Sequence, residues 1–521
     1  MLILDVEVYW YEVLFVNISL YFRDVMSAVV LLFFLYCGNI LLSSTVIGVN
    51  VNTEIENDFP SSNSDELELE QYPFEKSTEK FDDNNVAGIR IRGADIIYLS
   101  HDNRFFLEQG ANDPTFSSIR FFSQFPKLIS VEFSALKLTN GALKNIQNFL
   151  PKNILNIIID SCELEDGGEK LIGSVIKKPK NLKSIVIKFP NLSAERVEKI
   201  TSTLFNKSNM HHVRIFFDNI TCESCRHIAS LVKKSKNLET LTLAYGKVIY
   251  AEDAPKNEAA TEKKARGNVS LSKAIQKCTN LQSLNVSVIS MPNEDSKSLF
   301  DGIGDLKNLA SLNLFLGNLS EQDSSVLFSS AEVLKYSLSK LVNLKSLDLS
   351  GIGLTNNATK LIVQSIAYMP ELETLNLSSN AIDSECCTIL AELFKKTTKL
   401  KAVVLRGCGI ESSYFPIIAN TLQDLHLAIL SLGNNELGES IESIPIDLMP
   451  DLKFLDFANN DITFSAFMRF FNKVSDHDLV IDMKNNKNFY EDGDDKQNVA
   501  KRDQIMRAIK MSNSKLAVLG I

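Results

Sequence analysis

The sequence predicts an α/β solenoid in which short parallel strands line a concave face and helices cover the convex face. Three observations predict it. Apolar positions recur with a period near 28 residues, each copy opens with leucines that alternate with polar residues, and a stretch with one apolar face at helical spacing follows. One strand and one helix cannot bury a core, whereas stacked copies can.

The chain opens with an apolar segment. No charged residue occurs from Val25 to Val49, and Arg23 stands shortly before this run. About 20 apolar residues span a bilayer and ~7–15 suit a secretory core, so residues 1–49 fit either a signal peptide or a membrane anchor. A start at Met26 would leave a compact signal peptide, and a buried core helix is the third interpretation. The positive-inside rule places the chain beyond this segment outside the cytoplasm.

Residues 50–83 form an acidic spacer. From position 52 onward they carry eleven Asp or Glu residues against two lysines, which is most of the net charge of −10. Large apolar residues are too few to offset the entropy of ordering, so we expect disorder here. The rest of the chain lacks a basic stripe, so nucleic-acid binding is not expected. Residues 84–125 are predicted to be an amino-terminal cap, with a possible irregular copy at Val86–Ile96.

The repeat is clearest between Leu372 and Ile382. Leu375 and Leu377 alternate with polar residues, so both are expected to point inward from a strand, and Asn380 is expected to turn the chain. Six of the eleven intervals between copies are 28 residues. We therefore expect about twelve repeats over residues 126–475, with first positions at Leu128, Ile154, Leu182, Met210, Leu238, Leu281, Leu309, Leu344, Leu372, Leu400, Leu427 and Leu452.

This pattern resembles the ribonuclease-inhibitor-like subfamily of leucine-rich repeats, whose unit of about 28 residues is a strand, a turn and a helix. The resemblance implies a leucine-rich-repeat horseshoe that binds through its concave face and rims, without choosing among the family's many roles. The position of Asn380 is also filled by Asn435, Asn460, Cys162 and Cys408. Earlier copies carry Leu136, Pro190 or Ile289 there, so the internal ladder of hydrogen bonds is predicted to be discontinuous.

Two intervals break the period. The 43-residue interval contains Tyr250–Asn268, and the 35-residue interval extends the segment Glu321–Leu341. Insertions in solenoids map to loops at one edge, often on the binding side, although simple drift of solvated loops also explains them. Residues 476–521 are predicted to be a carboxyl-terminal cap, with an irregular thirteenth copy at Val480–Asn488 and a short helix at Asn498–Lys510.

Motifs for catalysis are missing. The sequence has no phosphate-binding glycine loop, no G-x-S-x-G and no H-E-x-x-H. Cys222 and Cys225 lack a second pair at zinc-site spacing, so both are expected at the start of a helix, and no disulfide framework is expected. His211 and His212 lack a partner at metal-ligand spacing. We therefore expect no enzyme, no metal and no cofactor.

The function predicted is a protein–protein interaction module, secreted or held by a single membrane anchor, with the repeats outside the cytoplasm. Two alternatives are a GTPase-activating regulator resembling the Ran-activating family, whose acidic carboxyl-terminal tail is absent here, and a substrate adaptor of a ubiquitin ligase. Both alternatives go with a cytoplasmic location. Contact with the membrane is expected only through the apolar amino-terminal segment.

The binding surface is predicted from the strand residues that alternate with buried leucines, because these face the concave side. Most copies present small polar residues there, whereas three consecutive copies present Ile158, Val186, Lys188, His212, Arg214 and Phe216. Ile158, Val186 and Phe216 are expected to form one apolar row, and the mixture with arginine is typical of interface hot spots. Selection for strand propensity is the alternative explanation. A smaller second candidate is Val404, Arg406 and Phe454.

Overall fold

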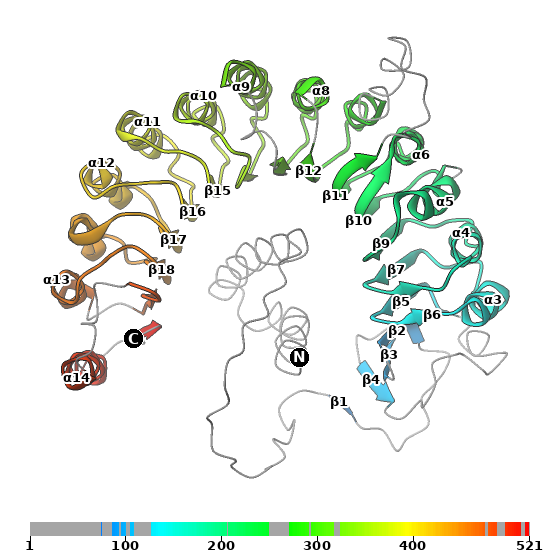
Figure 1. The fold of residues 1–521 in the computed structure, drawn as a ribbon, viewed down its shortest axis with the longest axis horizontal. Helices are drawn as coiled ribbons and strands as arrows, with labels where there is room; N and C mark the ends of the chain where they lie inside the picture. The colour runs from blue at the N-terminus through cyan, green and yellow to red at the C-terminus, as the bar shows by residue number, and fades with distance from the viewer. Residues whose placement is uncertain are drawn as a thin grey trace. The chain divides into compact units, whose positions relative to one another are not determined.

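The computed structural model describes residues 74–75, 86–92, 95–100, 105–108, 127–205, 207–249, 270–290, 293–316, 324–474, 478–486, 495–511 and 516–519. The predicted signal or anchor segment, nearly all of the acidic spacer and the Tyr250–Asn268 insertion lie outside these ranges. Contacts between residues divide the chain into two compact units, with the boundary between Cys278 and Thr279. In each unit the strands lie on the inner side of a curve and the helices on its outer side (Figure 1).

The amino-terminal unit contains five parallel strands in consecutive register: β5 (Ser130–Ser134), β7 (Asn156–Asp160), β9 (Ser184–Phe189), β10 (His212–Thr221) and β11 (Thr240–Ile249). The helices between these strands are α3 (Asn140–Phe149), α4 (Glu169–Lys177), α5 (Ala194–Leu204) and α6 (Cys222–Lys234). A second, two-stranded sheet joins β6 (Lys137–Leu138) to β8 (Glu163–Leu164) where the chain turns toward the helices.

The possible copy at Val86–Ile96 has a different form. β2 (Val86–Arg92) pairs parallel with β5 but antiparallel with β3 (Asp95–Ser100), which pairs antiparallel with β4 (Phe105–Glu108). β1 (Phe74–Glu75) pairs with β4. A hairpin therefore replaces the strand–helix unit at this end, because only two residues separate β2 from β3 and a parallel crossover needs about a dozen.

The carboxy-terminal unit shows the same alternation of strands and helices. Its strands are β12 (Ser283–Ser290), β13 (Ser311–Leu316), β14 (Ser346–Asp348), β15 (Thr374–Asn376), β16 (Ala402–Val404), β17 (Ile429–Ser431), β18 (Phe454–Asp456), β19 (Val480–Asp482) and β20 (Ala517–Leu519), all paired in parallel. The α-helices are α8 (Asn293–Ile303), α9 (Ser324–Leu338), α10 (Asn356–Ile366), α11 (Ser384–Phe394), α12 (Phe415–Ala419), α13 (Phe464–Val474) and α14 (Asp495–Met511). Short 3-10 helices η4 (Leu422–Asp424), η5 (Gly438–Ser443) and η6 (Ile446–Leu448) take the convex side of the later copies.

The predicted repeat register is confirmed. Each of the twelve first positions exposes at most 2% of its surface, and each lies two residues before the start of a strand. Leu375 and Leu377 are fully buried, as expected. The 35-residue interval contains a 15-residue helix, α9, so part of the extra chain lengthens a helix. The predicted helix Asn498–Lys510 lies within α14, and the irregular thirteenth copy contains β19 and the buried Asn486.

A ladder of buried asparagines closes the turns of the carboxy-terminal unit. Asn435 Oδ1 accepts hydrogen bonds from the backbone N–H groups of Cys408 and Ile410, both at 3.0 Å. Its Nδ2 donates to the carbonyls of Leu405 and Leu432, both at 2.8 Å. Asn380, Asn460 and Asn486 occupy the same place, preceded by residues of positive φ. Backbone groups that have left the strands are thereby satisfied inside the core.

Cysteine substitutes for asparagine in two copies. Cys162 Sγ donates to the Phe133 carbonyl at 3.3 Å, and Cys408 Sγ donates to the Leu377 carbonyl at 3.4 Å. Burial raises the pKa of both thiols to about 12, so neither is a reactive nucleophile. Leu136, which is 6% exposed, fills this place in an early copy, and the ladder is discontinuous as predicted.

Two further cysteines begin a helix. Cys222 and Cys225 lie in the first turn of α6, as predicted, and all seven cysteines in the described ranges are free.

Over the described ranges, no helix combines the length and apolar character needed to cross a membrane.

Candidate binding surfaces

The six residues predicted to bind a partner lie on three adjacent strands, β7, β9 and β10, and are called the amino-terminal patch. The parallel register pairs Ile158 with Val186 and Val186 with Arg214. It also pairs Lys188 with Phe216. The patch is therefore contiguous, because neighbouring strands are about 4.8 Å apart.

The predicted apolar row is wrong in one member. Ile158, Val186 and Arg214 each stand four residues after the first position of their copy, whereas Phe216 stands six residues after Met210. Copies that stack in parallel register align equal offsets, so Arg214 completes the row and Phe216 lies beside Lys188. One row of the patch thus consists of Ile158, Val186 and Arg214. The second row contains Lys188 and Phe216.

The polar members of the amino-terminal patch are only lightly restrained. Lys188 Nζ lies 3.5 Å from Asp160 Oδ1, with side chains 40% and 36% exposed, a setting in which an ion pair contributes about 0–1 kcal/mol. His212 Nδ1 lies 3.2 Å from Thr240 Oγ1. Arg214 is exposed and Phe216 is half-buried, so both can contact a partner without leaving the fold.

The adjoining His211 belongs to a different set of contacts. Its Nδ1 lies 3.0 Å from Glu239 Oε1 and its Nε2 lies 3.3 Å from Lys183 Nζ. These partners come from the positions just before the strands. His211 therefore lies beside the patch and serves to link three neighbouring copies.

The second predicted set lies on the carboxy-terminal unit. Ala402, Val404 and Ile429 form a buried apolar cluster, and Phe454 packs against it. The register of β16, β17 and β18 places Ala402, Ile429 and Phe454 in one row. The structure thus brings Val404 and Phe454 together, and adds Ala402 and Ile429, which the spacing of the sequence did not single out.

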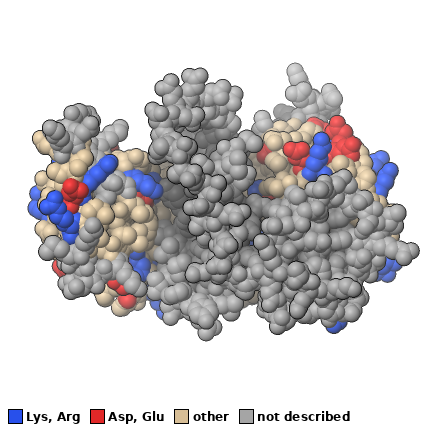
Figure 2. All heavy atoms as spheres, turned by 90° about the horizontal axis from the view of Figure 1, so that it is seen from below, with Lys and Arg blue, Asp and Glu red and all other residues tan. Residues whose placement is uncertain are grey.

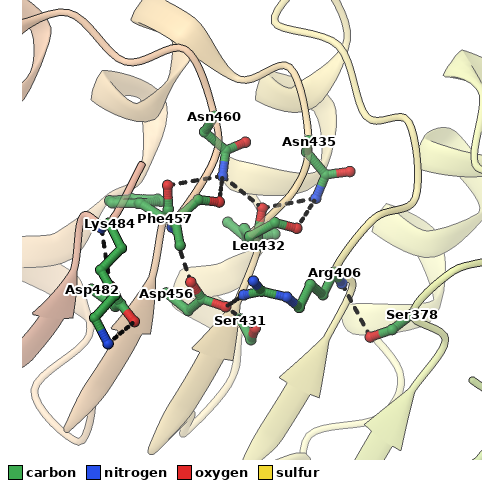
Figure 3. A network of polar contacts seen from close by, with 12 residues as sticks. Ser378, Arg406, Ser431, Leu432, Asn435, Asp456, Phe457, Asn460, Asp482 and Lys484 are labelled. Carbon is green, nitrogen blue, oxygen red and sulfur yellow. Dashed lines mark hydrogen bonds and ion pairs between the residues drawn. The ribbon is translucent and has the colours of Figure 1, made fainter. Parts of the chain in front are cut away.

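Arg406 lies beside this cluster in a network of polar contacts (Figure 3). Its Nη1 lies 2.6 Å from Asp456 Oδ2, and Ser431 Oγ donates to the same oxygen at 2.6 Å. The Arg406 backbone N–H donates to Ser378 Oγ at 3.1 Å. A Cβ atom on Gly433 would overlap both Arg406 Nη1 and Asp456 Oδ2. Arg406 is therefore held by its own chain and is a weaker candidate for an anchor than Arg214.

The strands β14, β15, β18 and β19 each have an Asp or Asn as their last residue. Asp348, Asn376, Asp456 and Asp482 each accept a hydrogen bond from the backbone N–H two residues later, at 2.9–3.0 Å. Each side chain thereby occupies a donor that the sheet leaves free. Burial raises the pKa of Asp348 and of Asp482. This role was not predicted from the sequence, although each of these residues is an Asp or Asn between two apolar residues.

Charges are mixed on the face shown in Figure 2. Where its atoms are described, Lys and Arg side chains lie beside Asp and Glu and form no continuous basic stripe. The described part of the chain also holds no cluster of histidine, cysteine or acidic side chains suited to a metal ion.

Comparison with known proteins adds little to this description. No protein-family model matches the chain, and no curated protein matches it. A similar solved structure is the crystal structure of the TLR13–ssRNA13 complex, with 16% sequence identity over 76% of this chain and a TM-score of 0.36. This chain spans 58% of the length of that one. The leucine-rich-repeat solenoid therefore rests on the strands, helices and asparagine ladder described above.

Proposed function

We propose that this chain is an exported or membrane-anchored recognition module that binds a protein partner through the amino-terminal patch. The observation that carries the proposal is the exposed Arg214 next to the half-buried Phe216, on strands fixed by parallel register. Arginine and aromatic side chains are enriched among the residues that dominate binding energy. The remaining copies offer mostly small polar residues at these positions.

The strands β7, β9 and β10 hold the residues of the amino-terminal patch in place before a partner binds. Val186 and Ile158 are half-buried beside Arg214, so a partner would cover an apolar floor that is already ordered. Ordering of side chains on binding costs about 0.5–1.5 kcal/mol each, and residues on a rigid sheet lose less of this freedom than residues on loops. The Lys188–Asp160 pair at the edge would contribute selectivity and association rate more than affinity.

Export is supported by the sequence of the amino-terminal segment, with Arg23 before a charge-free apolar run and an acidic spacer after it. The strand–turn–helix unit supports the resemblance to the ribonuclease-inhibitor-like subfamily. Such a scaffold does not by itself decide a function, so the proposal rests on the residues of the amino-terminal patch.

The decisive experiment measures the affinity of a partner identified by crosslinking to the full chain. Arg214→Ala and Phe216→Ala are each expected to weaken binding by more than ~1 kcal/mol, or about fivefold in Kd, with unchanged circular dichroism. Tyr336→Ala, on the outer helix α9 and 61% exposed, is the aromatic control and is expected to have no effect. Unchanged affinity in both patch variants would move the site to the rims or to the Tyr250–Asn268 insertion.

A further inference from the structure

Lysines gather at one edge of the amino-terminal unit, in the segments that lead from a helix to the next strand. The four segments before β7, β9, β10 and β11 contain nine lysines against one glutamate, a net charge of +8. The six equivalent segments before β13 to β18 contain eight lysines against six acidic residues, a net charge of +2. The even balance of charge outside the acidic spacer predicted no basic stripe, and this edge corrects that prediction. The nine residues are called the lysine edge: Lys152, Lys177, Lys178, Lys180, Lys183, Lys207, Lys233, Lys234 and Lys236.

Three members of the lysine edge connect neighbouring copies at the ends of helices. The Nζ atoms of Lys178, Lys207 and Lys234 donate to carbonyls at the carboxyl ends of α3, α4 and α5, at 2.6, 3.3 and 2.8 Å. Cations are favourable at this end of a helix, where carbonyls lack partners and the helix dipole is negative. The lysine edge is therefore continuous from copy to copy, and helix capping explains three of its members.

Helix capping does not explain the exposed lysines of the edge. Within the described ranges, Lys152, Lys177, Lys180 and Lys233 form no ion pair with a carboxylate. The Lys180 N–H donates to the Lys152 carbonyl at 3.4 Å, so their copies are in contact. Burial lowers the pKa of the Lys178 amine, and the nearby Lys152 lowers it further. Like charges gathered in this way repel one another and attract an anionic group.

An acidic segment of the same chain leaves the sheet at this edge. β1 pairs parallel with β4, and two antiparallel pairings lead from β4 through β3 to β2, which pairs parallel with β5. β1 therefore runs in the same direction as β5, β7, β9, β10 and β11. Residues before Phe74 leave the sheet at the edge where these strands begin. The segments that carry the lysines enter their strands at that same edge.

The acidic spacer carries the complementary charge within reach of the lysines. Residues 54–70 contain seven Asp or Glu residues and no Lys or Arg, and they stand four to twenty residues before Phe74. β1 and β11 are eight strand spacings apart, about 38 Å at ~4.8 Å each, whereas twenty residues of extended chain span up to ~66 Å. Attachment to β1 keeps the local concentration of this segment at about the millimolar level.

We propose that residues 54–70 of the acidic spacer bind the lysine edge of the same molecule. Attraction between many charges requires no regular structure in the segment, so the contact is compatible with the disorder predicted from its composition. The spacer then lies along the amino-terminal unit instead of extending away from it, and the lysine edge is unavailable to other polyanions. The lysine edge and the amino-terminal patch share no residue, and the inference does not depend on the proposed function.

Two measurements on the full chain in a neutral detergent test the contact. A carbodiimide joins a carboxylate directly to an amine, and crosslinks from residues 54–70 to the four exposed lysines are expected within monomers at ~50 mM salt. A glutamate-specific protease is expected to cleave residues 54–70 about fivefold faster when these lysines are replaced, because their ion pairs no longer protect the segment. Both the crosslinks and the difference in rate are expected to disappear at ~1 M salt, where the screening length is about 3 Å. The variant combines Lys152→Gln, Lys177→Gln, Lys180→Gln and Lys233→Gln.

The matched control replaces four lysines of the equivalent segment before β16. It combines Lys395→Gln, Lys396→Gln, Lys399→Gln and Lys401→Gln, which changes the net charge by the same amount. Its cleavage rate is expected to equal that of the wild type, with circular dichroism unchanged in both variants. Arg214→Ala is also expected to have no effect, so failure of this inference is separate from failure of the proposed function.

Three outcomes would overturn the inference. The first is an equal cleavage rate in the wild type and the first variant at low salt. The second is a set of crosslinks that forms only between molecules, or that reaches the lysines before β16 as often as the lysine edge. The third concerns a labelled polyglutamate peptide, which is expected to bind more tightly when the seven acidic residues are changed to amides; equal affinity for the wild type would show that the lysine edge is unoccupied.

Discussion

The guanidinium of Arg406 lies 2.6 Å from the carboxylate of Asp456, although 50 residues of chain separate them. The contact passes over β17, from the end of β16 to β18, and Gly433 leaves the space through which the side chain runs. Asp456 is 4% exposed and Arg406 is 23% exposed at the side chain, so water screens the pair weakly. The ion pair thus connects two copies that are not adjacent in the stack.

We expect this pair to show strong coupling in a double-mutant cycle. Arg406→Met and Asp456→Asn each remove one partner, and the coupling free energy of unfolding is expected to be about 1–3 kcal/mol in urea titrations. Gly433→Ala is expected to resemble Arg406→Met, because the added methyl group displaces the guanidinium. Additive effects within ~0.5 kcal/mol would show that the pair contributes no specific stability.

The asparagine ladder provides a second prediction. Asn435→Ala removes the partner of three buried backbone groups, the N–H groups of Cys408 and Ile410 and the carbonyl of Leu405, and is expected to lower the free energy of unfolding by at least ~2 kcal/mol. The Leu432 carbonyl keeps its hydrogen bond from Asn460 Nδ2. The adjacent Asn434→Gly is the matched control, since Asn434 is exposed and has a φ of 56°, which glycine adopts readily. Equal stability of the two variants would contradict the role assigned to Asn435.

The core of the best-formed copy is tested by Leu377→Ala. Leu377 is fully buried, so loss of its side chain is expected to cost roughly 2–5 kcal/mol as transfer and cavity terms combine. Tyr368→Ala, which is 60% exposed, serves as a surface control with an expected change within ~0.5 kcal/mol. A cost below ~0.5 kcal/mol for Leu377→Ala would mean that the register is misassigned.

The raised pKa of Asp348 predicts a pH dependence. A carboxyl group whose pKa is higher in the folded state stabilises the fold fully below its unfolded pKa, and this contribution is lost as the pH rises through the folded value. Asp348→Asn removes the charge that burial disfavours, so its thermal midpoint is expected to exceed that of the wild type at pH 7. Near pH 3, below the unfolded pKa of ~3.9, the difference is expected to vanish.

The control for this experiment is Asp447→Asn, which makes the same substitution at an exposed position on η6. An offset for Asp348→Asn that is equally large at both pH values would assign its effect to packing and not to ionisation.

The topology proposed for export is tested with a reporter fused to the carboxyl terminus. Protease added to intact cells is expected to reach the reporter, or a secreted form is expected in the medium, because Arg23 precedes the apolar run. Arg23→Glu, which removes the charge bias, is expected to reduce the exported fraction. A reporter that stays protected while no secreted form appears would refute the proposal.

Much of the candidate binding surface was predictable because each copy repeats the same offsets. The sequence placed Ile158, Val186 and Arg214 on the inner face, and it grouped Val404 with Phe454, which lie on β16 and β18 with β17 between them. The expected row with Phe216 was wrong because Phe216 stands two residues further along its copy than the other two members. The partner of Arg406 was not predictable, because a side chain that crosses one strand to reach the next has no signature in the spacing of a single copy.

By itself the sequence determined the repeat, its register and the alternation of buried and inner-face residues, because these depend on distances of a few residues within one copy. Only the tertiary structure decided how side chains from different copies meet. The Arg406–Asp456 pair requires a glycine at position 433, which belongs to neither copy that forms it. Whether the side-chain atoms Asn285 Oδ1 and Asn376 Nδ2 find a hydrogen-bond partner depends on which side chains lie beside them on the neighbouring strands. Such choices depend on side-chain length, direction and the space left by neighbouring copies, and periodicity along the chain carries no information about them.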